Sequence, residues 1–256
     1  MTDVLVLCYH ALSPDWPAAL STTPERFEEQ LTWLVERRGY RGATFEQAVT
    51  RPPAPRTLAV TFDDGYRSVL ELAKPIMDRL GIPGSIYVPT DWPGRGPMRW
   101  EGIDQWLAGP HEHEMSCLGW DELRGMAADG WEVGSHTRSH PHLTRLDDAR
   151  LRDELEASKA ACEDGLGAPC RSIAYPYGDV DARVTAGARA AGYGVAASLP
   201  KGRFSRGERL DWPRVGVYNA DDLRRFEVKT APALRRARST PLWDLAARAR
   251  RYARRP

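Results

Sequence analysis

The sequence lacks the features of an exported or membrane-spanning chain. No basic segment precedes the short apolar run from Val4 to Leu7, whereas an export signal needs a charged beginning and a longer apolar stretch. No run approaches the about 20 apolar residues that a membrane-spanning helix requires. We therefore expect a cytoplasmic protein.

Cysteine is scarce, and phosphate-binding glycine motifs are missing. The four cysteines, at positions 8, 117, 162 and 170, form no Cys-x-x-Cys pair, so neither a thiolate zinc site nor a disulfide framework is indicated. No Gly-x-Gly-x-x-Gly or Gly-x-x-x-x-Gly-Lys follows an apolar run, which removes the usual nucleotide-binding loops. We expect isolated buried thiols and no nucleotide cofactor.

Charge is balanced in total but unevenly distributed. Lys and Arg number 36 and Asp and Glu 35, yet residues 234–256 hold eight of the basic residues and one acid, which leaves a net charge of −6 elsewhere. We expect a domain over 1–230 and a solvated, partly disordered basic tail over 231–256. A basic helix in weak contact with an anionic membrane surface is the alternative, and no nucleic-acid partner is expected.

Short apolar runs alternate with amphipathic stretches along the whole chain. Strands are predicted at 4–9, 40–44, 58–62, 85–88, 131–134, 172–175, 194–197 and 214–217. Helices are predicted at 24–38, 67–80, 120–128, 147–166 and 180–191. This alternation indicates parallel strands joined by right-handed crossovers, and a single TIM-like α/β barrel is favoured over an open doubly wound sheet because nucleotide-binding motifs are missing.

The segment from Thr90 to Cys117 interrupts this alternation. It is rich in Trp, Gly and Pro and too long for an ordinary connection, so we expect an ordered loop over one end of the barrel. Its His-Glu-His-Glu run (111–114) is expected to be solvated or to face substrate, because alternate residues of an extended segment point to opposite faces. Tryptophans in this region could stack on sugar rings or pack in a core; they are Trp92, Trp100, Trp106 and Trp120.

Polar residues follow three of the predicted strands. Asp63 and Asp64 end one strand, and their charges would repel one another unless a cation or a proton compensates. His136 and His140 follow a later strand, and on one helical turn their imidazoles could share a metal. Pro176 and Gly178 rigidify a turn after the next strand, which leaves the Tyr177 amide free to point outward. In a parallel barrel these strand ends meet on one face.

Two motifs carry a family resemblance. TFDDG (61–65) and SHTRSH (135–140), in this order, resemble the first two motifs of the polysaccharide deacetylases of carbohydrate esterase family 4, which share the NodB homology domain. The resemblance covers roughly Val4 to Val217. It implies a distorted (β/α)7–8 barrel that binds one divalent metal, usually zinc. It also implies an enzyme that hydrolyses non-peptide C–N bonds.

The resemblance also assigns roles to individual residues. It implies that Asp64, His136 and His140 are metal ligands, that Asp63 is the general base, and that the backbone N–H of Tyr177 holds the oxyanion. A three-ligand site leaves a position for water and substrate. The implied reaction is metal-dependent hydrolysis of the acetamide of an N-acetylhexosamine-containing glycan or glycoside, with release of acetate. Two alternatives are hydrolysis of another non-peptide amide and an inactive binding module.

The chain departs from the usual family pattern at two positions. No histidine follows His142, where the family places its acid, and Ala174 stands where the family has an arginine. A circularly permuted branch, which includes poly-N-acetylglucosamine deacetylases, begins with an apolar strand ending in Tyr-His, and the start of this chain is similar. We therefore predict His10 as the proton donor. Arg214 is the candidate for the missing arginine, holding Asp63 ionised; an ordinary surface ion pair is the alternative.

Overall fold

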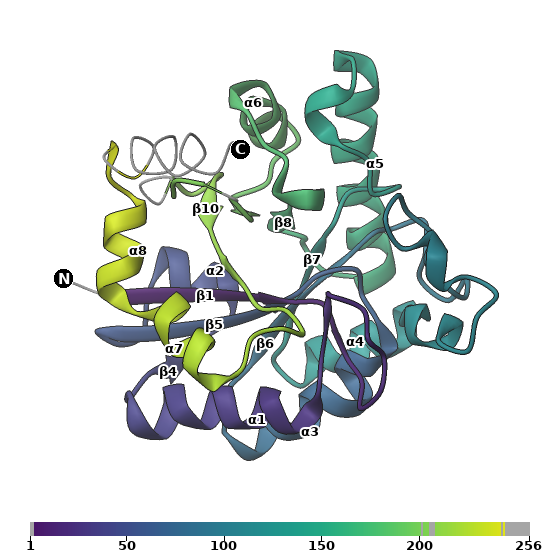
Figure 1. The fold of residues 1–256 in the computed structure, drawn as a ribbon. Coiled ribbons are helices and arrows are strands. Elements are labelled where there is room, and N and C mark those ends of the chain that lie inside the picture. The colour runs from purple at the N-terminus through teal and green to yellow at the C-terminus, as the bar shows by residue number, and fades with distance from the viewer. Residues whose placement is uncertain (1–2, 201, 205–207, 242, 244–256) are drawn as a thin grey trace, which may run out of the picture.

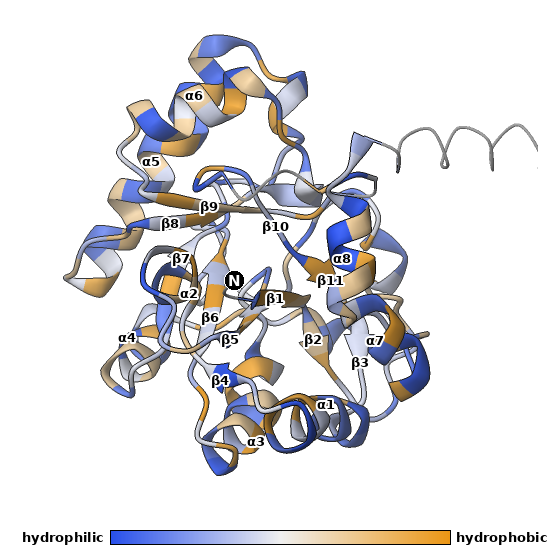
Figure 2. Cartoon of the chain, turned by 90° about the vertical axis from the view of Figure 1, so that its left-hand side faces the viewer, coloured by the Kyte–Doolittle hydropathy of each residue, from blue (hydrophilic) through white to orange (hydrophobic). Residues whose placement is uncertain are grey.

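The computed structural model describes residues 3–200, 202–204, 208–241 and 243. Within them, nine parallel strands form one sheet that curls into a nearly closed barrel with helices outside (Figures 1 and 2). The order is β10 (Trp212–Pro213), β9 (Val195–Ser198), β8 (Ser172–Ala174), β7 (Glu132–Ser135), β6 (Gly84–Val88), β5 (Arg56–Phe62), β1 (Asp3–Tyr9) and β11 (Val215–Gly216). The short β4 (Arg41–Gly42) pairs with the start of β5. The predicted single α/β barrel is confirmed.

The ring closes at Arg214. β10 pairs with β9 at one edge of the sheet, and β11 pairs with β1 at the other edge. The backbone N–H of Arg214, between the two short strands, donates to Ser198 O at 3.0 Å. The sequence predicted one strand over 214–217; the structure has β11 within that range and a further short strand, β10, before Arg214, where the chain changes pairing partner.

The helices begin and end at the expected signals. Thr23 caps α1 (Pro24–Thr32) by accepting from Arg26 N, and the coil continues in wider turns as η1 (Trp33–Arg37). The other predicted helices are η2 (Val69–Ala73) with α3 (Lys74–Arg79), α4 (Trp120–Ala128), α5 (Asp148–Leu166) and α6 (Ala182–Ala190). Sequence patterns missed α2 (Phe45–Thr50), which is too short for a clear period, and the Arg-rich α7 (Leu223–Thr230) and α8 (Pro232–Arg238).

Along each strand, successive side chains point alternately toward the outer helices and toward the inside of the ring. Residues 58, 60 and 62 of β5 pack in a cluster with residues of α1 and α3, whereas Ala59 joins a separate inner cluster. Val6 of β1 and Trp212 of β10 belong to the same inner cluster, as does Phe45 of α2, which covers the amino end of the ring. By this alternation Cys8, Asp63 and Arg214 are directed inward at the carboxyl end.

The long loop forms an ordered layer over the carboxyl end, as predicted. It contains η3 (Asp104–Trp106) and η4 (Glu112–Met115), and it packs a small core with β2 (Ala11–Leu12) and with the segment leading to β3 (Ser21–Thr22). The His-Glu-His-Glu run is coiled as η4 and not extended, and the His113 side chain in it is exposed to solvent. Glu114 accepts from Ser13 Oγ at 2.5 Å, and its carboxylate lies within 4.8 Å of ligand atoms of His111 and Asp15.

The first part of the predicted basic tail packs against the barrel. In α8, Arg235 Nη2 donates to Asp3 Oδ1 at 2.6 Å, and Arg238 lies over the Phe204 ring at 3.9 Å. The ordered contacts therefore extend beyond the predicted boundary at residue 230, and residues 244–256 lie outside the described part. None of the described helices is long and apolar enough to cross a membrane.

Candidate active site

Asp63 and Arg214 form a buried ion pair at the carboxyl end of the ring. Arg214 Nη1 donates to Asp63 Oδ1 at 2.6 Å, and Nη2 donates to Oδ2 at 2.7 Å. Nη1 also donates to Thr61 Oγ1 at 3.0 Å, and the guanidinium side chain has no exposed surface. The sequence-predicted contact is therefore present, and the surface ion pair offered as the alternative is wrong.

The ion pair fixes the charge of Asp63. Burial alone would raise the pKa of this carboxyl, but the charge and hydrogen bonds of Arg214 outweigh burial and hold it well below its usual range. The side chain of Asp63 is 4% exposed, so water screens the attraction very little. Asp63 is consequently ionised at neutral pH, and both of its oxygens are oriented by the two-pronged guanidinium.

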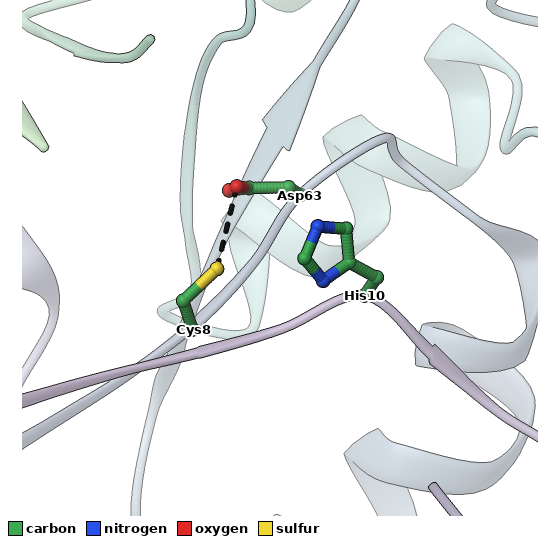
Figure 3. Close-up of side chains that lie close together, drawn as sticks. All are labelled: Cys8, His10 and Asp63. Carbon is green, nitrogen blue, oxygen red and sulfur yellow. Dashed lines mark hydrogen bonds between the residues drawn. The ribbon is translucent and has the colours of Figure 1, made fainter. Parts of the chain in front are cut away.

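Cys8 and His10 approach Asp63 from the end of β1 (Figure 3). The Cys8 thiol donates to Asp63 Oδ2 at 3.4 Å, and burial raises its pKa well above the usual value, so it stays protonated. A nitrogen of His10 lies within 4.8 Å of an Asp63 oxygen and of the Cys8 sulfur. Burial, opposed by the Asp63 charge, lowers the pKa of His10 to about 4, so the imidazole is neutral at pH 7.

Asp64, His136 and His140 converge next to this pair. Asp64 Oδ1 lies 3.6 Å from His136 Nε2 and 3.4 Å from His140 Nε2, and all three residues are buried. The Nδ1 of His136 lies 2.7 Å from the Ala174 carbonyl oxygen, which can only accept. That nitrogen therefore carries the hydrogen, and the lone pair of Nε2 faces Asp64.

These three side chains fit a divalent cation. Ligands about 2.0–2.1 Å from a tetrahedral zinc ion lie about 3.3 Å apart, close to the separations of their ligand atoms. Neither carboxylate oxygen of Asp64 has a hydrogen-bond partner among the described residues, although both are buried. Burial and the Asp63 charge raise the pKa of Asp64 to about 8. Asp64 therefore needs a positive partner to remain ionised at neutral pH.

Left-handed backbone conformations gather at this site. Asp64, Thr137, His140 and Tyr177 have φ values of 69°, 66°, 62° and 59°, and Ala108 is the only other described non-glycine residue of this kind. Such conformations cost about 1–3 kcal/mol each and persist where the surroundings impose them. His136 and His140 do not lie on one helical turn: the segment is an irregular loop, and the two imidazoles meet because Thr137 and His140 turn the chain back.

Tyr177 forms another wall of the site. It lies in the turn η6 (Pro176–Gly178), where Gly178 has φ 66° and a side chain would collide with Leu199 O at 2.5 Å. The Tyr177 ring stacks on His142 at 3.9 Å and meets His140 edge-on at 4.7 Å. The turn thus places the Tyr177 ring beside the His140 imidazole.

A cavity of about 310 Å³ adjoins these residues. Aromatic side chains from three segments line it together with His10: Trp100 and Trp106 of the long loop, Tyr177 and Tyr218. Trp120, grouped with the other tryptophans by sequence, instead packs against the hydrophobic core between α4 and α5. The cavity offers aromatic faces and one imidazole beside the Asp64 cluster.

The family model of polysaccharide deacetylases matches residues 50–196, more than half of the chain. The chain belongs to the polysaccharide deacetylase family. It is 24% identical over 210 residues to YxkH of Bacillus subtilis (strain 168), covering 80% of this chain and 67% of that protein. It is 37% identical over 99 residues to the chitooligosaccharide deacetylase of Bradyrhizobium sp. (strain ANU 289), covering 37% and 41% of the two chains. IcaB from Ammonifex degensii has a similar structure (TM-score 0.72, 26% identity, 90% and 98% covered).

The family match contains only part of the predicted site. Asp63, Asp64, the two histidines and Tyr177 fall within residues 50–196, whereas His10 and Arg214 lie outside them. The fold nevertheless brings both to Asp63. The roles assigned to these polysaccharide-deacetylase residues remain predictions.

Sequence reasoning missed two residues that contact the site. Cys8 binds Asp63, and only its inward register on β1 distinguishes it from an ordinary buried thiol. Glu154 of α5 binds the loop between His136 and His140. A glutamate in the apolar stripe of Leu151, Leu155 and Cys162 was the signal that could have revealed it.

Proposed function

We propose that the protein is a metal-dependent N-deacetylase that hydrolyses the acetamide of an N-acetylhexosamine unit in a glycan or glycoside. The observation that carries the proposal is the convergence of Asp64, His136 and His140 within 4.8 Å, directly beside the Asp63–Arg214 pair. Membership of the polysaccharide deacetylase family supports the substrate class. The aromatic cavity supports it as well, because aromatic faces suit sugar rings.

Asp64, His136 and His140 would hold the cation. A divalent ion at these residues supplies Lewis acidity toward water and the acetyl carbonyl. Zinc fits two imidazoles and one carboxylate better than magnesium or calcium does, since those ions prefer all-oxygen sites. The neutral imidazole of His136, fixed by Ala174, is in the correct tautomer to be a ligand.

Asp63 is proposed to accept the proton of the attacking water. Its carboxylate is ionised, oriented by Arg214 and lies 4.0 Å from His136 Nε2. A base with a low pKa is effective here only toward a water that has already been made acidic, which is the condition that a divalent cation provides. The backbone N–H of Tyr177 is proposed to bind the oxyanion that forms on the acetyl carbon.

His10 is proposed to give a proton to the leaving amine. Because its pKa is about 4, the resting imidazole is neutral and must first take up the proton that enters through Asp63. The imidazolium that results is a strong acid in this buried position. It therefore protonates the amine nitrogen readily and returns to the neutral form. The proton taken from water is thus the one given to the amine, and the enzyme ends the turnover in its starting state.

The test is a panel of amide substrates assayed for released acetate in the presence of zinc. N-acetylglucosamine oligomers of increasing length, single N-acetylhexosaminides and non-acetylated cyclic amides would be compared. We expect acetate release only from the N-acetylhexosamine substrates. Hydrolysis confined to the non-acetylated amides would replace the deacetylase proposal with another amidase, and zinc binding without any hydrolysis would indicate a binding module.

Zinc is expected to stabilise the folded protein. At a free ion concentration 100-fold above Kd, binding adds about 2.7 kcal/mol to the free energy of unfolding. Thermal unfolding after treatment with a chelator, with and without added Zn²⁺, measures the effect. His136→Ala should lose the response, whereas His113→Ala, an exposed loop position, should keep it. If zinc raised the unfolding temperature of both variants equally, zinc would bind at a site other than Asp64, His136 and His140.

Replacing His10 with alanine is expected to reduce deacetylation about 10²-fold while zinc affinity stays unchanged. The amine leaving group requires a proton, but 4-nitrophenolate does not. We therefore expect a much smaller loss of hydrolysis on 4-nitrophenyl acetate than on an N-acetylated sugar. Steady-state rates on the two substrates provide the comparison, with His113→Ala as the control. Equal losses on both would show that His10 does not act as the acid.

A further inference from the structure

One buried carboxylate holds the loop that carries both histidines of the site. Glu154 Oε2 accepts from the backbone N–H groups of Arg138 and Ser139, each at 2.9 Å. Glu154 Oε1 accepts from Ser139 Oγ at 2.5 Å. The residue is 4% exposed, and no Lys, Arg or His of the described residues forms an ion pair with it. Its charge is therefore balanced mainly by donors of the loop.

The same face of α5 contacts the start of the loop. Ser158, one turn beyond Glu154, lies 3.0 Å from Ser135 Oγ, which in turn accepts from Thr137 N at 3.1 Å. Arg138 Nη1 also pairs with Asp153 Oδ2 at 2.7 Å. The helix thus contacts the loop at both sides of His136, with the buried contacts made by Glu154 and Ser158.

The loop conformation requires such external contacts. Thr137 and His140 lie in the left-handed region, which a β-branched residue rarely adopts. Hydrogen bonds inside the loop fix little of it: His140 N donates to Thr137 Oγ1 at 3.1 Å. The backbone donors of Arg138 and Ser139 point toward Glu154 of α5. Without an acceptor there, these partly buried donors would bond to solvent instead, and the loop would hold the two histidines less firmly.

We propose that Glu154 is a positioning residue that sets the spacing of His136 and His140 before a metal binds; this rests on the metal site of the proposed function. The chemistry requires a carboxylate, because two N–H groups and one hydroxyl converge on its two oxygens. A glutamine at 154 has one acceptor oxygen, and its amide hydrogens face the donors of the loop. Groups that orient metal ligands commonly change metal affinity about 10–100-fold when they are removed.

The experiment compares Glu154→Gln with Glu156→Gln in the full chain. Glu156 is exposed on the same helix, two residues away, and within the described part of the chain no hydrogen bond or ion pair joins it to the loop. Competition with a chromogenic chelator gives the zinc affinity of each protein, and unfolding of the chelator-treated proteins gives their stability. We expect zinc affinity to fall about 10–100-fold in Glu154→Gln and less than about 2-fold in Glu156→Gln. Turnover at saturating zinc should recover to near the parent rate.

Ser139→Ala provides a second test that keeps the loop backbone and Glu154 in place. It removes the donor to Glu154 Oε1, so zinc affinity should fall in the same direction by a smaller factor. Parent-like zinc affinity in folded Glu154→Gln overturns the proposal, and if that variant does not fold, parent-like affinity in Ser139→Ala does so. Because zinc affinity is measured apart from acetate release, a parent that binds zinc but releases no acetate contradicts only the proposed function.

Discussion

Asp63→Asn is expected to lower acetate release about 10³–10⁴-fold at saturating zinc, with zinc affinity changed by less than a few-fold. The amide accepts no proton near neutral pH, and its NH₂ group faces the Arg214 guanidinium in place of one of the two acceptor oxygens. Asp64, the neighbouring carboxylate, keeps its place between the histidines. The loss should therefore appear in kcat, with the metal still bound.

Steady-state acetate release and metal content by mass spectrometry measure the two effects separately. Asp78→Asn is the matched control, since Asp78 pairs with Lys74 on the exposed side of α3. Turnover within 10-fold of the parent would show that another group, His10 first among them, takes the proton. Loss of the metal together with activity would show that Asp63 is a ligand.

Arg214→Met is expected to reduce the free energy of unfolding by about 3–5 kcal/mol at pH 7, because it leaves Asp63 as a buried carboxylate without a cation. In the parent the pKa of Asp63 lies below its unfolded value of about 4. The pair therefore stabilises the protein fully above that pH and loses its effect as the pH falls. In the variant burial raises the pKa of Asp63, so the penalty is present at neutral pH and fades in acid.

Urea unfolding at pH 7 and pH 4 measures this difference. The gap between parent and variant should be larger at pH 7, and Asp63→Asn combined with Arg214→Met should be less destabilised than Arg214→Met alone. Arg214→Lys keeps the charge without the two-pronged geometry and should lie between the parent and Arg214→Met. If the difference in free energy of unfolding between parent and Arg214→Met were the same at both pH values, lost packing would explain it and not the charge of Asp63.

The sequence was informative where short-range patterns determine the structure. Apolar runs located the strands of the barrel, and paired acids at the end of one strand required a positive partner, which the structure provides in Arg214. The residues that resemble family motifs converge as expected. His10 was predicted because the start of the chain resembles the permuted branch of the family and no histidine follows His142, and its proximity to Asp63 follows from pairing of β1 with β5.

Features that depend on distant contacts could not be predicted in this way. The spacing of His136 and His140 suggested a helical turn, but hydrogen bonds from the loop to Glu154 impose an irregular path. The chain leaves β9 and pairs with β1 at Arg214, between β10 and β11. That change depends on where β9 and β1 end, and no local sequence signal marks it. The helices α7 and α8 were not predicted because they are polar and few apolar residues recur in them at helical spacing.

Closure of the ring at Arg214 has a consequence for the order in which the protein matures. Asp63 and Arg214 are 151 residues apart, and their contact requires the last strand to reach the first. Contacts of such long sequence separation are entropically costly and tend to form late in folding. The proposed metal ligands, within residues 64–140, can assemble earlier. Recovery of hydrolysis during refolding is therefore expected to lag behind recovery of zinc binding, so that activity reports the completed barrel.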